Sequence, residues 1–155
     1  MTTRSIYSRI GDAIVKRLQS LALCSASDVL LRKFPWIVPG VVDSPSIIVS
    51  HVPERIAEAT NESDDWTIGH AVACCAASNR DNTIANDSEG LLLWRERIIQ
   101  DLLRDKRLAD VPEVAAVSIE PGALWDPEAF RANWDASIFI VRSLVRRNRR
   151  GAPQT

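Results

Sequence analysis

Few residues in this chain of 155 could carry out acid–base or nucleophilic chemistry. His51 and His70 are its two histidines, and each stands in an apolar run of the kind that forms strands. Cys74 and Cys75 are adjacent in an apolar run without the basic neighbours that lower the pKa of a thiol. We therefore expect structural roles for these four side chains. An enzyme becomes the better interpretation if His51, His70 and Cys75 line one pocket.

Motifs for metals, disulfides and phosphate groups are missing from the sequence. The third cysteine, Cys24, makes the number odd, and no C-x-x-C spacing predicts a zinc site or a disulfide framework. Asp64 and Asp65 could together hold a metal ion, although such a pair more often lies in a solvated acidic loop. The glycine-rich loops and hydrolase motifs of common enzyme families do not occur. The sequence therefore predicts a protein that is not an enzyme and uses neither a cofactor nor a metal.

Charge is unevenly distributed along a chain whose formal net charge is only -1 at pH 7. The segment 53–65 contains one basic residue, Arg55, and is expected to be an acidic loop. Its acids are Glu54, Glu58, Glu62, Asp64 and Asp65. No acid follows Asp135, and 146–155 is expected to be a basic tail. The C-terminal arginines are Arg142, Arg146, Arg147, Arg149 and Arg150. They could contact the acidic loop of a neighbouring subunit, bind nucleic-acid phosphates, or form a solvated and frayed end.

Five tryptophans are many for a chain of this length. Trp94 and Trp134 fall on expected core faces. Trp36 and Trp125 stand in irregular segments, where a partner surface is as good an interpretation as the core. We therefore expect Trp36 or Trp125 to anchor a contact between subunits or with a partner.

The elements that must position these residues follow from the apolar periodicity. Apolar residues recur at three- and four-residue steps over 86–107, which predicts a helix, and a second amphipathic helix is expected over 5–23 with Ser5 as its cap. Strands are expected over the ranges 46–52, 66–77, 113–120 and 133–147. The face of the last strand that carries Trp134 and Ile138 is expected to meet the helices.

This order of elements predicts an α+β fold, with a single mainly antiparallel sheet of four or five strands and two helices packed on one face. Residues 1–155 are expected to form one domain that includes an irregular arm over about 24–45. No signal peptide and no apolar run of the roughly 18 residues of a membrane span is found, so no membrane partner is expected. We expect a reducing compartment such as the cytosol.

Three stretches carry a resemblance to a known family. They are the W-R-E core of the long helix at Trp94, the V-x-x-V-x-I-E-P-G stretch that begins at Val114, and the N-W-D-A-S-x-F-I-V-R stretch that begins at Asn133. Together with the N-terminal amphipathic helix, they make the chain similar to the tail terminator proteins of long-tailed bacteriophages. The likeness runs from about Ser5 to Arg150.

The resemblance implies a homo-oligomeric ring, usually of six subunits, that caps the finished tail tube, stops its polymerisation and offers a docking surface to the filled head. The partners it implies are other copies of the chain, the tail tube protein and the connector proteins of the neck, with DNA passing through the lumen. It places the protein in the tail or neck of the virion after assembly in the host cytoplasm. The alternatives are another neck or tail-tube component, or a small nucleic-acid-binding α+β module that uses the arginine-rich C-terminus.

Overall fold

The computed structural model describes residues 3–34, 44–78, 82–84 and 86–149. The elements follow one another as α1 (Ile6–Ser20), a short 3-10 turn η1 (Ala26–Asp28), β1 (Val29–Arg32), β2 (Ser46–Glu58), β3 (Ser63–Ala77), α2 (Asn86–Arg104), β4 (Val114–Glu120), α3 (Pro127–Arg131) and β5 (Trp134–Asn148). No helix in these ranges is long and apolar enough to cross a membrane.

The five strands form one sheet in the order β1-β2-β3-β5-β4. β1 runs parallel to β2, and every other neighbouring pair is antiparallel. β3 is central and is buried from Ile68 to Ala76, because elements pack on both of its faces. The predicted α+β fold with a single mainly antiparallel sheet is confirmed.

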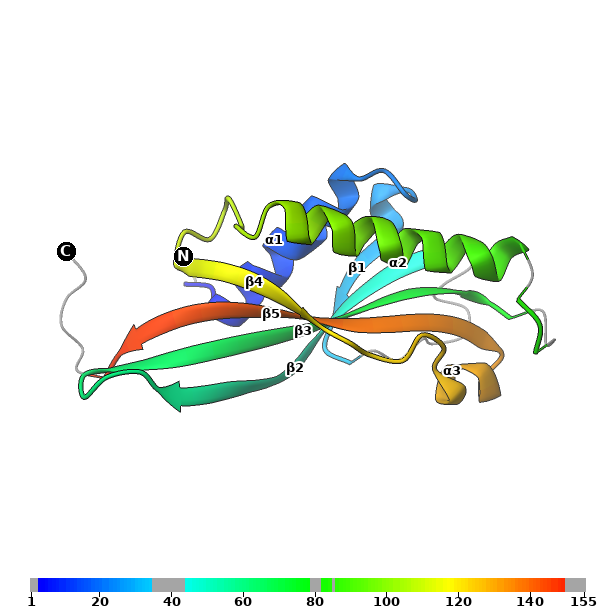
Figure 1. Cartoon of the computed structure of the whole chain (residues 1–155). Coiled ribbons are helices and arrows are strands. Elements are labelled where there is room, and N and C mark those ends of the chain that lie inside the picture. The colour runs from blue at the N-terminus through cyan, green and yellow to red at the C-terminus, as the bar shows by residue number, and fades with distance from the viewer. Residues whose placement is uncertain (1–2, 35–43, 79–81, 85, 150–155) are drawn as a thin grey trace.

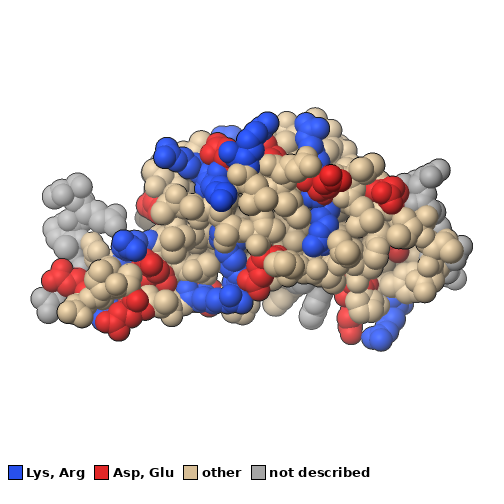
Figure 2. All heavy atoms as spheres, in the orientation of Figure 1, with Lys and Arg blue, Asp and Glu red and all other residues tan. Residues whose placement is uncertain are grey.

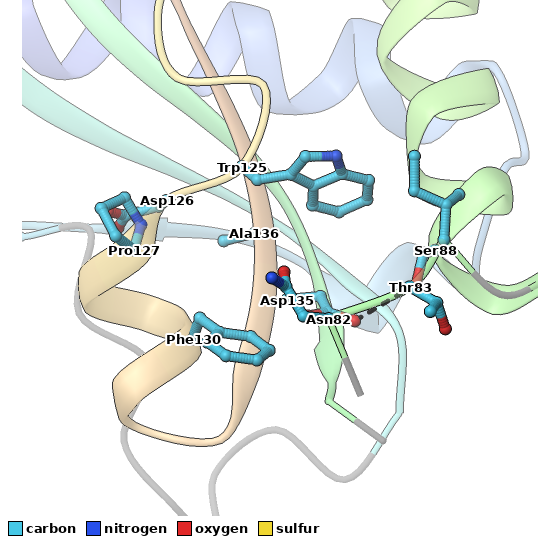
Figure 3. Close-up of a pocket in the computed structure, with 10 residues that line it drawn as sticks. Asn82, Thr83, Ser88, Trp125, Asp126, Pro127, Phe130, Asp135 and Ala136 are labelled. Carbon is cyan, nitrogen blue, oxygen red and sulfur yellow. Dashed lines mark hydrogen bonds between the residues drawn. The ribbon is translucent and has the colours of Figure 1, made fainter. Parts of the chain in front are cut away.

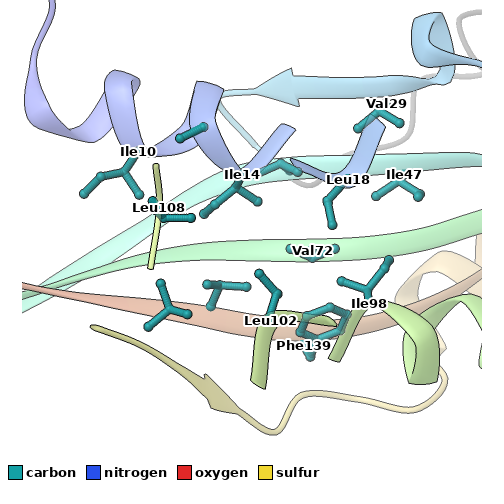
Figure 4. Packing of buried hydrophobic residues seen from close by; sticks show 14 of the residues in the cluster. Ile10, Ile14, Leu18, Val29, Ile47, Val72, Ile98, Leu102, Leu108 and Phe139 are labelled. Carbon is teal, nitrogen blue, oxygen red and sulfur yellow. The ribbon is translucent and has the colours of Figure 1, made fainter. Parts of the chain in front are cut away.

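Both long helices pack on the same face of the sheet (Figure 1), as the sequence predicts. α1 begins where the Oγ of Ser5 accepts a hydrogen bond from the Ser8 backbone N–H at 3.2 Å, so the expected cap is present. Apolar residues at helical spacing then face the strands. Figure 4 shows the resulting core, which α1 supplies with Ile10, Ile14 and Leu18, α2 with Ile98 and Leu102, and the sheet with Ile47, Val72 and Phe139.

The short helix α3 lies on the other face of the sheet (Figure 1) and is not one of the two helices predicted from the sequence. Beneath it a second apolar cluster contains Trp134, Ala136 and Cys75. The prediction that the Trp134 and Ile138 face of β5 meets the long helices is therefore wrong. Phe139 and its alternate neighbours on β5 meet them instead. The error arises because α3 makes the second face of β5 apolar as well.

The acidic loop predicted over 53–65 is instead a continuation of two strands. β2 extends to Glu58 and β3 begins at Ser63, with Glu58 opposite Asp64 across the hairpin. A register shift between Val52 and Arg55 accommodates Pro53, which cannot donate a ladder hydrogen bond. Residues 53–58 are all exposed. Neither face of the hairpin is buried there, so no apolar alternation marks it in the sequence.

The far end of the sheet is a three-stranded ribbon that extends past α1 (Figure 1). We call it the distal ribbon, and it contains 53–58 of β2, 63–66 of β3 and 146–148 of β5. β1 pairs with β2 only up to Ser50, and β4 pairs with β5 only up to Val145. Neither outer edge of the distal ribbon therefore has a strand partner within the described ranges.

Two further predictions change at the ends of these strands. The arm expected to be irregular over 24–45 contains η1 and β1, with Val29 opposite Ile47 in parallel pairing. Likewise, β5 runs to Asn148, so the first three residues of the expected basic tail belong to a strand. Trp36 and Arg150 lie outside the described residues.

Candidate interaction site

The two histidines lie side by side under α1. His51 is opposite His70 in the β2–β3 pairing, and their ring centroids are 5.0 Å apart. His70 is fully buried, with its Nε2 3.1 Å from the backbone oxygen of Tyr7. Because a carbonyl can only accept, Nε2 of His70 carries the proton. Burial, with a smaller contribution from His51, lowers the pKa of His70 to about 4, so the ring is neutral at pH 7.

The cysteines do not join this histidine pair. Cys75 belongs to the cluster on the opposite face of the sheet, where its Sγ donates to the backbone oxygen of Ser46 at 3.4 Å. Cys74 packs in the main core. Burial raises the pKa of both thiols to about 12, which leaves them protonated at neutral pH. The pocket of His51, His70 and Cys75 that would favour an enzyme is not formed.

The acidic and basic segments meet within one chain, at the distal ribbon. Antiparallel pairing sets Asp65 opposite Arg146, and their side chains form an ion pair at 2.8 Å. Arg149 contacts Asp64 at 2.7 Å and Glu58 at 3.4 Å. The hydrogen bond from Arg146 holds the pKa of Asp65 below its usual value. Figure 2 shows acidic and basic side chains intermixed at this end of the molecule (left).

This pairing corrects the reason for expecting the acidic and basic segments to meet between subunits. In the sequence, the segments 53–65 and 142–150 are far apart, so they look like two separate charged patches. Since β3 and β5 are neighbours in the sheet, the opposite charges face each other inside the same subunit.

The remaining predicted residues of the distal ribbon also have partners in the same chain. The Tyr7 hydroxyl donates to Glu54 at 3.3 Å, and the guanidinium of Arg147 lies 5.6 Å from the centre of the Trp66 ring. The backbone oxygen of Glu62 accepts a hydrogen bond from the backbone N–H of Arg149 at 2.7 Å. These contacts tie the ribbon to the start of α1 and close its tip.

Arg142 is buried, with 8% of its surface exposed. Its Nε donates to Glu120 at 2.7 Å, and a terminal nitrogen donates to the backbone oxygen of Pro53 at 3.0 Å. Arg55 contacts the same Glu120 at 3.2 Å. Arg142 therefore links β4 to the irregular point in β2 across the intervening strand, and it has a structural role.

Trp125, expected to anchor a partner contact, stands in the wall of a surface pocket of about 380 Å³. The pocket lies where the loop before α2, the start of α2, α3 and the start of β5 converge (Figure 3). Its lining residues are Asn82, Thr83, Ile84, Ser88, Trp125, Asp126, Pro127, Phe130, Asp135 and Ala136. We call it the Trp125 pocket.

Two carboxylates lie at the Trp125 pocket, and they have different roles. Asp126 is the cap of α3 and accepts the backbone N–H of Glu128 at 3.2 Å. Asp135 is half-buried and accepts the hydroxyl of Ser88 at 3.4 Å. Neither forms an ion pair with a residue that the structure describes. The pocket therefore combines aromatic rings with the carboxylate of Asp135, which has no ion-pair partner among the described residues.

A buried arginine holds the loop that carries Trp125. One terminal nitrogen of Arg95 donates to the backbone oxygens of Ala123 and Ile138, at 3.1 and 2.8 Å, and to the Ser137 hydroxyl at 3.0 Å. The guanidinium also lies 5.5 Å from the centre of the Phe139 ring. Arg95 thus fixes the loop after β4 against β5, and with it one wall of the pocket.

Sequence reasoning identified Trp125 but missed Phe130 and Asp135. The signal for Phe130 was present, because Asp126 followed by Pro127 is a helix-start pattern that predicts α3. No local signal marks Asp135, which reaches the pocket through contacts distant in sequence. Among the described residues, no group of three or more potential metal ligands is found.

Comparison with known proteins does not identify a family for this chain. No protein-family model matches the chain, and a search of curated proteins finds no significant match.

Proposed function

We propose that the chain is a structural subunit that assembles head to tail into a closed ring, and that this ring caps the tail tube of a long-tailed phage, ends its polymerisation and joins the tail to the neck. The proposal rests on the resemblance in the three sequence stretches and on the distal ribbon. The ribbon is the observation that carries it.

The distal ribbon has the properties of an assembly surface. Its two outer edges offer backbone N–H and C=O groups without a strand partner in the described chain, and such edges add strands from other chains. Ile56 is 54% exposed on it, beside Trp66 on the paired strand. Monomeric proteins usually shorten or cover their edge strands, so a long open ribbon favours an oligomer.

A closed ring also requires two unlike surfaces that meet around an axis. The distal ribbon and the Trp125 pocket lie at opposite ends of the molecule in Figure 1, where α3 marks the pocket end. One end of a subunit could therefore contact the other end of the next. A stable contact between two subunits would bury about 800 Å² on each side. The ion pairs inside the ribbon would contribute to assembly by keeping the strands of the ribbon in register.

Another neck or tail-tube component is the near alternative, since it would use the same ribbon. The nucleic-acid-binding alternative has less support. Arg142, Arg146 and Arg149 pair with carboxylates of the same chain, and Arg147 stacks on Trp66. These contacts already use part of the charge that would attract phosphate.

The test is the mass of the purified protein by light scattering, alone and with the tail tube protein of the same phage. We expect a closed oligomer, six subunits by the resemblance, and an arrest of tube growth when the protein is added. A monomer in both samples, with tubes that elongate at an unchanged rate, would rule the proposal out.

A further inference from the structure

The Trp125 pocket has the chemistry of a cation site. Trp125 and Phe130 supply aromatic faces, and Asp135 supplies a carboxylate without a cation partner in the part of the chain that is described. In Figure 3 the two rings come from the side of α3 and Ser88 from the side of α2, with Asp135 between them. Aromatic faces and a carboxylate both attract an organic cation, since the ring face and the carboxylate are negative.

The size and rim of the pocket point to a side chain of another protein. Its volume of about 380 Å³ is near the lower end of the range for ligand sites, roughly 300 to 1,000 Å³. Large apolar side chains of its lining stand exposed, with Ile84 61% and Phe130 39% exposed. Exposed apolar side chains gathered at a pocket are typical of protein contacts, and a small free amine would leave them largely uncovered.

We propose that the Trp125 pocket binds a lysine or arginine side chain presented by a partner protein. The aliphatic stem would pack between Trp125 and Phe130 while the charged end reaches Asp135, and apolar residues that flank the cation would cover Ile84. Such an anchor fills a pocket at the centre of a contact, as interface hot spots do. The inference goes beyond the proposed ring and does not depend on it, because any partner with this chemistry would fit.

The test uses two acetylated and amidated peptides, Leu-Lys-Leu and Leu-norleucine-Leu, which differ only in the cation. Binding is followed by the NMR signal of the Trp125 indole N–H, which Trp125→Phe assigns. We expect the lysine peptide to bind about fivefold more tightly than the norleucine peptide, since a partly exposed ion pair with a cation–aromatic contact contributes about that much. Added salt should weaken the binding of the lysine peptide and leave the binding of the norleucine peptide unchanged.

Two variants distinguish recognition of the cation by Asp135 from nonspecific attraction to the negative charge of the protein surface. Asp135→Asn keeps an oxygen for the Ser88 hydroxyl and should remove the preference for lysine, leaving norleucine binding unchanged. Glu128→Gln removes one charge from the exposed face of α3, outside the lining of the pocket, and should leave both affinities within about twofold.

Several results would overturn the inference. If the two peptides bind equally, or if the Asp135→Asn variant keeps the wild-type preference, the pocket does not recognise the positive charge of the ligand. If the indole N–H signal of Trp125 in the wild-type protein shows no saturable shift, the pocket is not a binding site for these peptides. Butylammonium that binds as tightly as the lysine peptide would make the ligand a small amine instead of a protein. Should Asp135→Asn unfold, the salt dependence of the two peptides on the wild-type protein still decides the matter.

Discussion

The side chain of Arg142 crosses the sheet directly over Gly69. A Cβ added to residue 69 would lie 2.5 Å from a terminal nitrogen of Arg142 and would also collide with a methyl group of Val52. The path of Arg142 from Glu120 to Pro53 therefore exists because residue 69 has no side chain.

Gly69→Ala should lower the free energy of unfolding by about 1 to 3 kcal/mol, as overpacking in a tight site does. The added methyl would push Arg142 from the Pro53 oxygen while Val52 has little room to yield. Urea denaturation measures the change. Gly90→Ala on α2 is the matched control, since its Cβ would meet nothing within 4 Å. It should stabilise by about 0.5 to 1 kcal/mol through helix propensity, and an equal loss in both variants would contradict the clash.

Arg95→Met should cost about 2 to 3 kcal/mol and loosen the wall of the Trp125 pocket. Methionine fills much of the space of the stem but leaves the oxygens of Ala123 and Ile138 and the Ser137 hydroxyl without this donor. Arg97→Met, on the exposed face of the same helix, should stay within about 0.5 kcal/mol. Thermal unfolding of the two variants checks the difference, and acrylamide quenching of a protein with Trp125 as its single tryptophan reports the loosened wall.

Stability should fall as the pH is lowered from about 6.5 to about 4, because of His70. The unfolded chain binds a proton at this residue near pH 6.5, whereas the folded chain, in which the ring is buried, binds it only near pH 4. The unfolded state therefore holds more protons in this window, and the loss is of the order of 3 kcal/mol. Urea denaturation at several pH values should show a shallower decline for His70→Gln, whose amide can still donate to Tyr7. Parallel curves for the two proteins would assign the decline to other groups.

Ile56→Asp should reduce assembly without unfolding the subunit. Ile56 is 54% exposed on the distal ribbon, so an aspartate there adds a charge to the proposed interface at little cost to the monomer. Leu93→Asp on α2 is the matched control, with a starting exposure of 57% at a helix surface away from the ribbon. Light scattering and thermal unfolding together give the answer. If only the Leu93→Asp variant fails to assemble, the interface is formed by α2 and not by the distal ribbon.

The parts of the fold that follow a local period could be predicted from the sequence. The leucines and isoleucines of α1 and α2 predict both helices, and the β-branched and apolar runs predict four of the five strands. The prediction fails where burial does not impose a period. The outer half of β2 is wet on both faces, so Glu54 and Glu58 resemble a loop, although they lie in a strand.

The candidate site shows the same limit. Trp125 stood out as a large aromatic residue in an irregular segment, but its neighbours Ser88 and Asp135 come from α2 and β5. Their proximity depends on strand order and on the crossing of α2 over the sheet, neither of which a local pattern reports. For the same reason, the ion pair between Asp65 and Arg146 could be found only once β3 and β5 were known to be neighbours.

The position of β5 between β3 and β4 also has a consequence for biosynthesis. β5 follows both of its neighbours along the chain, so ribosomes make the apolar edge of β3 and the whole of β4 before the strand that joins them exists. The nascent chain must keep that edge, which includes Val72 and Cys74, unpaired until residues 134–148 emerge. Exposed apolar edges of this kind aggregate readily. Newly made chains should therefore depend on chaperones or low temperature for a good yield, and a chain truncated before Trp134 should accumulate as inclusion bodies.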